Sequence, residues 1–311
     1  MAFSDLTKEV LSPIAVQTLA EATGKFRYFT TNFTPQGASQ YSGVQVAVYD
    51  LTAAQFVKDT NDWCDGETPG GLVIPLEKHS IAGIALPDTG IQTASAAGYG
   101  ETDANVAQIV RDASIGIIRA LEKDITTNIY GKFTTSNIKE TPVEFDTGSM
   151  TYAKWGSLVA TAATKFDVTN GVMILDSATF YGDFLPCLPS NVVYVEKDPV
   201  DSGVVKNVMG LKAVICIPNG KLGSSLNGAI VAPEAFGIVS RYNAPAINGY
   251  FDTFKVTTED GFTVGFRAFE NLCQGEMKFA GDCLYGSKFL HIDATTSKAT
   301  GVLPLIADTE D

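Results

Sequence analysis

Residues 102–131, TDANVAQIVRDASIGIIRALEKDITTNIYG, decide the fold of this chain. Thr102 and Asp103 offer an N-cap, and no proline or other break follows until Gly131, apart from the tolerated Gly116. The pattern predicts one helix of about 28 residues, roughly 40 Å long, well above the mean helix length of about 11–12 residues. One face carries apolar residues at steps of three or four and is expected to be buried: Val106, Ile109, Val110, Ala113, Ile117, Leu121, Ile125.

The first 40 residues have little core of their own. They end in an extended polar stretch, FTTNFTPQGASQ at 29–40. An isolated arm of this kind cannot bury enough apolar surface to offset its ordering entropy. We therefore expect it to lie on another surface.

Residues 41–90 are strand-like. Val44, Val46 and Val48 alternate with other residues at the period of a half-buried strand. The turn-forming, acidic stretch TNDWCDGETPGG at 60–71 follows, and then the apolar runs 72–76 and 81–86. This order predicts one strand leading out, a loose tip and a strand leading back. Such a two-stranded excursion is marginal alone and needs a neighbour.

Two different sequence patterns follow one another downstream of the helix. Residues 151–235 alternate helical and strand patterns, which predicts a compact α/β subdomain. Residues 251–257 and 262–269 flank TEDG at 258–261, a strong hairpin signal. Two further short strands, at 277–279 and 288–291, and a polar tail ending at Asp311 are expected after it.

Composition narrows the class of protein. With 311 residues, 45% of them hydrophobic and 18% charged, the chain can bury a core of one large or two ordinary domains. No apolar run approaches the ~18 residues of a membrane span, and the N-terminus lacks a secretory signal. We therefore expect no membrane association, and use in a cytoplasm or in something assembled there. A net charge of −13 disfavours DNA-binding proteins and suits a container for DNA.

Motifs for catalysis, cofactors and metals are missing. The histidines are His79 and His291, and neither accompanies a G-x-S-x-G elbow. No phosphate-binding loop occurs, and 98–103 lacks the third glycine of a dinucleotide fingerprint. The spacing of Cys273, Cys283 and His291 is unlike that of zinc sites. The five cysteines include no C-x-x-C and are expected to be reduced and mostly buried. We therefore predict no catalytic, cofactor or metal residues and no enzyme.

The order of parts resembles the Hong Kong 97 capsid fold of tailed bacteriophages. Residues 76–88, LEKHSIAGIALPD, resemble the returning strand of the E-loop, and 101–133 resemble the spine helix of the P-domain. The stretch GAIVAPEAFGI at 228–238 resembles the family's strand leading into an alanine–phenylalanine segment. LYGSKFL at 284–290 resembles its closing strand.

The resemblance implies an α+β fold with five parts. These are an N-terminal arm (1–40), an E-loop (41–90), a P-domain with the spine helix (91–150), an α/β A-domain (151–235), and the closing β region of the P-domain with C-terminal strands (236–311). The arm and E-loop would extend over neighbouring subunits, which explains their poor cores. The proposed intersubunit contact at the E-loop tip comprises Trp63, Asp65, Glu67, Pro69.

The implied function is that of a major capsid protein, which self-assembles through pentamers and hexamers into an icosahedral or prolate shell around double-stranded DNA. The implied partners are copies of itself, portal and scaffolding proteins and decoration proteins, with DNA enclosed but not bound at specific sequences. The expected location is the virion, after assembly in the host cytoplasm. Some relatives begin with a charged scaffolding segment; its absence here implies a separate scaffold or a trimmed form.

Three other interpretations stay open at this point. An encapsulin-like nanocompartment has the same fold with protein cargo. A soluble enzyme with two α/β lobes would be a monomer or small oligomer with a polar pocket. A tail-tube or other ring-forming virion protein is disfavoured by the long helix, because tube proteins are mainly β.

Overall fold

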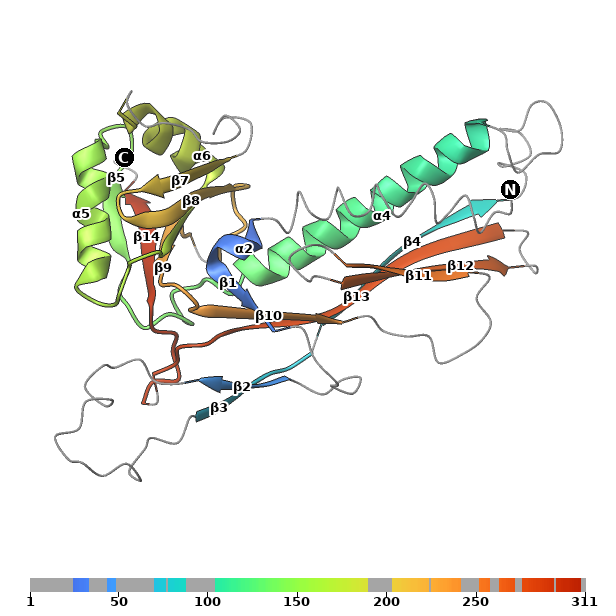
Figure 1. The fold of residues 1–311 in the computed structure, drawn as a ribbon. Helices are drawn as coiled ribbons and strands as arrows, with labels where there is room; N and C mark the ends of the chain where they lie inside the picture. Colours follow the sequence, from blue (N-terminus) through green and yellow to red (C-terminus); the bar gives the residue numbers. More distant parts are fainter. Residues whose placement is uncertain are drawn as a thin grey trace.

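The computed structural model describes residues 25–33, 44–48, 70–76, 78–87, 104–189, 203–223, 225–241, 252–257, 263–271, 276–293 and 295–308. These residues form a mixed α+β fold with two six-stranded sheets and a separate two-stranded pair. Figure 1 shows a long helix lying along one sheet, while the second sheet with its shorter helices lies at one end of this helix. The helices are α2 (Phe26–Phe29), α4 (Ala104–Tyr130), α5 (Tyr152–Ala163) and α6 (Ser177–Thr179), the last continued by the π-helix η2 (Phe180–Phe184) and the 3-10 helix η3 (Leu185–Cys187).

The first sheet is built around one long strand, β13. Its order is β1-β10-β13-β12-β11, and β4 also pairs with β13. Residues 284 and 285 of β13 pair with both β4 and β10, and 276–282 pair with both β4 and β12, so β10 and β12 share one edge of β13 and β4 lies along the other. The strands are β1 (Thr30–Asn32), β4 (Lys78–Pro87), β10 (Phe236–Arg241), β11 (Asp252–Thr257), β12 (Thr263–Asn271) and β13 (Glu276–Phe289).

The expectation of two short strands at 277–279 and 288–291 is wrong, because β13 is continuous over 14 residues. Gly281 and Gly286, which lie between the two predicted strands, allow close packing and do not form a turn. A methyl carbon on Gly281 would lie 2.8 Å from Cγ2 of Ile117 and 2.9 Å from Cδ1 of Leu121, both on α4. Glycine therefore lets the helix lie directly on the strand. The predicted hairpin is confirmed, since β11 and β12 pair antiparallel.

Helix α4 matches the helix predicted from the apolar spacing, and its 27 residues end at Tyr130. It packs on β4 and β13. The proposed cap, Thr102 and Asp103, lies outside the described residues. The helix is covered along one side by the first sheet, which is the environment that a single apolar face predicts.

The second sheet has the order β5-β14-β9-β6-β8-β7 and separates two layers of core. Alternate residues of β6 divide between them: Val172 and Ile174 belong to the cluster shared with α4, while Met173 and Leu175 pack with Trp155 of α5. This division follows from the period of two along a strand. The strands are β5 (Val143–Asp146), β6 (Val172–Asp176), β7 (Val204–Val208), β8 (Leu211–Ile217), β9 (Gly228–Val231) and β14 (Val302–Asp308).

The end of the chain differs from the expected polar tail. Strand β14 is inserted between β5 and β9, parallel to the first and antiparallel to the second. Val302, Leu303 and Leu305 are buried at 0%, 1% and 0% exposure. The second sheet therefore combines the 151–235 segment with strands from either side of it in the sequence.

The β2–β3 pair also differs in part from expectation. β2 (Val44–Val48) and β3 (Gly70–Ile74) pair antiparallel, as a strand leading out and a strand leading back require. Residues 78–87, which the resemblance assigns to the returning strand, instead form β4 and pair with β13. The predicted strand at 192–195 lies outside the described residues.

Candidate functional site

The predicted site residues fall into three groups. Trp63, Asp65, Glu67 and Pro69, the proposed contact at the loop tip, lie outside the described residues. Val106, Ile109, Val110 and Ala113 belong to α4, but their side chains are outside the described part. The remaining three are buried, at 4%, 1% and 0% exposure: Ile117, Leu121, Ile125.

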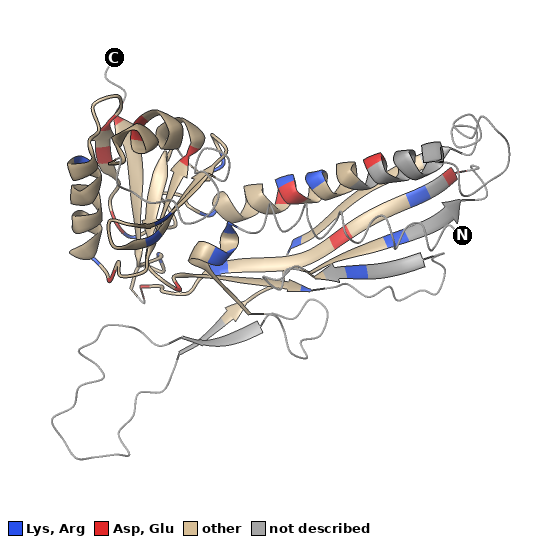
Figure 2. Ribbon diagram, turned by 45° about the horizontal axis from the view of Figure 1, so that its top comes forward, with Lys and Arg blue, Asp and Glu red and all other residues tan. Residues whose placement is uncertain are grey.

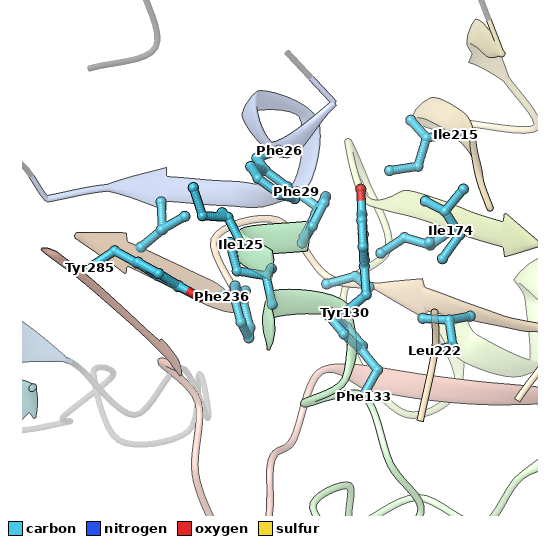
Figure 3. Packing of buried hydrophobic residues seen from close by; sticks show 14 of the residues in the cluster. Phe26, Phe29, Ile125, Tyr130, Phe133, Ile174, Ile215, Leu222, Phe236 and Tyr285 are labelled. Atoms are coloured by element: carbon cyan, nitrogen blue, oxygen red, sulfur yellow. The ribbon is translucent and has the colours of Figure 1, made fainter. Parts of the chain in front are cut away.

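The C-terminal end of α4 is buried on more than the predicted face. Ile118 and Tyr130 are at 0% and 2% exposure, although neither belongs to the predicted stripe. Here α4 enters an apolar junction that also contains residues of α2 and of both large sheets. Figure 3 shows the packing of Phe26, Phe29, Tyr130, Phe133 and Phe236 at this point. Neighbours bury this end of α4 on several sides, so a prediction that only one helical face is buried misses Ile118 and Tyr130.

Aromatic rings connect the elements in this junction. The ring centroids of Phe133 and Phe236 lie 5.4 Å apart, and those of Phe236 and Phe289 lie 4.9 Å apart. Phe29 of α2 lies 6.0 Å from each of Phe133 and Phe236. These separations are in the range of favourable aromatic pairs. Helix α2, too short to be stable by itself, is held by this core.

Lys25 connects the segment that contains α2 to the second sheet. Its Nζ donates a hydrogen bond to the carbonyl of Cys216 on β8 at 2.7 Å. Burial lowers the pKa of Lys25, and a Coulombic interaction with Cys216 opposes this shift. Segment 25–33 therefore contacts the second sheet through Lys25 and pairs with the first sheet through β1.

A polar network lies on the face of the first sheet away from α4. Asp282 Oδ2 accepts one hydrogen bond from Arg267 at 3.0 Å and lies 3.0 Å from Nε2 of His79. The three residues come from the neighbouring strands β12, β13 and β4. Asp282 is buried at 4% exposure. The network ties three strands together through one carboxylate.

The side chains of His79 and Ser80 lie on opposite faces of the first sheet. Ser80 donates a hydrogen bond to Asp124 of α4, whereas His79 contacts Asp282 on the opposite face. Adjacent residues of a strand point to opposite faces, so this separation follows from the backbone. No cluster of three or more metal-ligating side chains occurs among the described residues.

Thiols in the described residues are free. Cys216 and Cys283 are buried, as expected, and Cys187 is partly buried. Burial raises the pKa of Cys283 well above its ordinary value, and the Asp282 charge adds to this shift. A thiol with a raised pKa stays protonated and is a poor nucleophile. Cys64 and Cys273 lie outside the described part of the chain.

Tyr285 lies on the α4 side of β13, and the pH dependence of protein stability tests whether its side chain is buried there. Burial raises its pKa to about 12 from an ordinary value of 10.0. In the unfolded chain the phenol loses its proton near pH 10, and in the fold only near pH 12, so the stabilisation present below pH 10 is lost as pH rises between these values. We expect the urea midpoint to fall over this window, and to fall less steeply in Tyr285→Phe. Parallel curves for the two proteins would contradict the burial of this hydroxyl.

Exposed charges of both signs follow one another along the described part of α4. Asp112, Arg119, Lys123 and Asp124 are all exposed, and Figure 2 shows acidic and basic positions interspersed along the helix. Binding to a nucleic-acid backbone requires a basic stripe or patch. Along this helix the described residues form none. No helix of the described chain is long and apolar enough to cross a membrane.

Comparisons with known proteins give the fold. No family model and no curated protein matches the sequence. The capsid structure of the cyanophage P-SCSP1u is similar at a TM-score of 0.50 and 11% identity, covering 92% of this chain and 88% of that chain. The capsid of Ralstonia phage GP4 is similar at a TM-score of 0.50 and 8% identity, covering 91% and 88%. A virus-like particle from Pyrococcus furiosus has a TM-score of 0.48 at 11% identity, covering 96% and 98%.

The likeness to the two phage capsids extends over almost the whole of each chain, so it concerns the complete architecture and not one common motif. At such low identities it concerns the fold alone. The chain therefore has the mixed α+β fold of a phage capsid protein.

Proposed function

We propose that the chain is the major capsid protein of a tailed bacteriophage and self-assembles into the closed shell around its double-stranded DNA. The observation that carries this proposal is the similarity to two solved phage capsids over 92% and 91% of the chain. A fold alone does not establish a function, because one fold can serve several. Three features of this chain itself also support a shell protein.

The first supporting feature is the β2–β3 pair, which forms a two-stranded unit and pairs with no strand of either large sheet. A two-stranded pair has few internal contacts and needs a neighbouring surface. In a shell this surface belongs to another subunit. We assign residues 41–90 to an E-loop of this kind, with Trp63, Asp65, Glu67 and Pro69 as its intersubunit contact. Within this range β4 (78–87) belongs to the first sheet, so the excursion from the body ends with β3.

The second feature is the elongated body, in which α4 runs beside the first sheet and the second sheet lies at one end (Figure 1). Repeated contacts between unlike surfaces of such a body generate closed rings, and rings of five and six subunits close into a shell. We assign 91–150 and 236–311 to the P-domain and 151–235 to an A-domain near the ring centre. The second sheet also includes β5 and β14, so the lobe extends beyond those last bounds.

The third feature is chemical. A net charge of −13 and mixed charges along α4 suit a wall that encloses DNA without holding its phosphates. The proposal includes no enzymatic activity and no cofactor. Its partners are copies of the same chain, portal and scaffolding proteins and, on the finished shell, decoration proteins. The protein would be assembled in the host cytoplasm and located in the virion.

Negative-stain electron microscopy with light scattering tests this proposal. The purified full-length chain, alone and with its scaffolding protein, should form rings of five or six subunits or closed particles of uniform diameter. Absorbance at 260 and 280 nm of particles from infected cells should then show enclosed DNA. A monomer or dimer under all salt and pH conditions would overturn the proposal in favour of a soluble enzyme.

The contents of the particles separate the two shell hypotheses. Closed particles that hold protein and no nucleic acid would favour the encapsulin-like nanocompartment. The fold is common to both, so composition and not shape decides between them. DNA-filled particles would support the phage capsid.

A further inference from the structure

Two glycines mark the place where the β2–β3 pair joins the body. Gly237 of β10 and Gly286 of β13 lie on adjacent strands, with Gly237 opposite Lys288 and Gly286 opposite Val239. Neither glycine has a positive φ. Their backbone conformations are therefore open to other residues, and glycine must be needed there for space.

The space is occupied by the chain that returns from β3. A methyl carbon on Gly286 would lie 1.9 Å from the carbonyl oxygen of Pro75 and 2.9 Å from its carbonyl carbon. Normal carbon contacts are about 3.5–4.0 Å. Because the obstructing atoms are backbone, they can be avoided only if the segment after β3 moves.

At Gly237 the ends of β1 and β3 meet. A methyl carbon there would lie 2.8 Å from Cδ1 of Ile74, where β3 ends, and 3.2 Å from Cε2 of Phe33, the residue after β1. Phe33 donates its backbone N–H to the carbonyl of Ile238 at 2.9 Å. Phe33 and Ile74, which lie at the ends of β1 and β3, are therefore packed at one point of the first sheet.

A small apolar cluster holds this point, separately from the main core. Ile74 and Leu76 are buried at 0% and 2% exposure against Val239, Leu284 and Leu290, with Phe33 beside them. Lys288 adds a hydrogen bond from its Nζ to the carbonyl of Val73 at 3.4 Å. Figure 1 shows the β2–β3 pair beside β10, on the side of the first sheet away from α4.

We propose that Gly237 and Gly286 form a notch that fixes where and in which direction the β2–β3 pair leaves the body. The notch holds the ends of β1 and β3 before any neighbour is present, so the pair is already oriented when subunits meet. Preorganisation of this kind lowers the entropy lost on association. Its consequence for shell assembly rests on the proposed function, whereas the notch itself is a property of the single subunit.

Amide hydrogen exchange on the unassembled full-length chain tests the notch. Gly286→Ala should accelerate exchange in peptides covering 70–76 by about tenfold or more, because overpacking displaces that segment. Peptides of α5 and β6 should be unchanged. Gly156→Ala in α5 is the matched control, since a methyl carbon there has no atom within 4 Å. Unchanged exchange at 70–76 in Gly286→Ala would overturn the proposal, as would a uniform increase throughout the chain.

A milder pair of variants keeps the test decisive if Gly286→Ala does not fold. The atoms nearest a methyl carbon at Gly237 are side-chain ends, Cδ2 of Leu290 at 2.7 Å and Cδ1 of Ile74 at 2.8 Å. Gly237→Ala should accelerate exchange at 70–76 less than Gly286→Ala does. Ile74→Val removes Cδ1, so adding it to Gly237→Ala should restore part of the protection. Additive effects of the two substitutions would overturn the steric coupling.

Assembly of the same variants connects the notch to function. If the wild-type chain forms shells, Gly286→Ala should reduce the yield of closed particles severalfold or broaden their diameters, and Gly156→Ala should not. Normal particles from Gly286→Ala would overturn the role in assembly. If the wild-type chain forms no shells, the proposed function fails, and hydrogen exchange still decides whether the notch exists.

Discussion

Replacing Phe133 by alanine should lower the free energy of unfolding by about 3–5 kcal/mol, the range for large aromatic deletions in a core. Phe133 is at 0% exposure and contacts the rings of Phe29, Phe236 and Phe289. These partners belong to α2, β10 and β13, so the cavity would open between three elements. The strand backbones limit how far the rings can move into the space, which places the cost at the upper part of the range.

Urea denaturation of the unassembled chain measures this loss. Tyr152→Ala is the control, because that aromatic side chain is 37% exposed at the start of α5, and its removal should change stability by less than about 0.5 kcal/mol. Phe133→Leu keeps most of the volume and should cost less than about 1.5 kcal/mol. A loss below about 1 kcal/mol in Phe133→Ala would mean that the junction is loosely packed.

Helix α4 could be predicted because one surface covers most of its length. The first sheet lies along one side, so burial repeats every three or four residues and the sequence displays that period. The prediction is incomplete at Ile118 and Tyr130, where α2 and the second sheet also approach. Neighbours that pack on a second side of a helix bury further residues, but the periodic spacing of the main apolar face stays the same.

Strands β13 and β14 were harder to predict because their sequences carry residues that usually interrupt strands. Gly281 and Gly286 are explained by atoms far away in the sequence, on α4 and at Pro75. Pro304 lies within β14 and suggests an edge or a loop, although β14 has neighbours on both sides. Tertiary packing decides these cases, and a single sequence does not display it.

The polar network is a further case in which local spacing gives little information. His79 and Asp282 are 203 residues apart, and only the pairing of β4 with β13 brings them together. One signal was available: Asp282 stands in an otherwise apolar stretch of β13, FAGDCLYG at 279–286. A carboxylate in such a stretch requires a partner, because an isolated buried charge is very costly.

The carboxylate of Asp282 should accordingly be among the most sensitive polar groups of the described fold. We expect Asp282→Ala to lower the free energy of unfolding by about 3 kcal/mol, the cost of breaking a buried ion pair from one side. Its side chain is 5% exposed and that of Arg267 is 16% exposed. Urea denaturation at neutral pH measures the change.

A surface ion pair supplies the matched control. Asp146 and Lys154 lie 3.4 Å apart with side chains 60% and 47% exposed, so Asp146→Ala should cost less than about 0.5 kcal/mol. The double variant Asp282→Leu with Arg267→Met removes both charges and should recover much of the loss, because the penalty comes from the charge left behind. If the double variant is no more stable than Asp282→Ala, the carboxylate contributes through the strand contacts of β4 and not through Arg267. A loss below about 1 kcal/mol in Asp282→Ala itself would mean that water or another acceptor reaches the guanidinium, and that this face of the sheet is open in the single subunit.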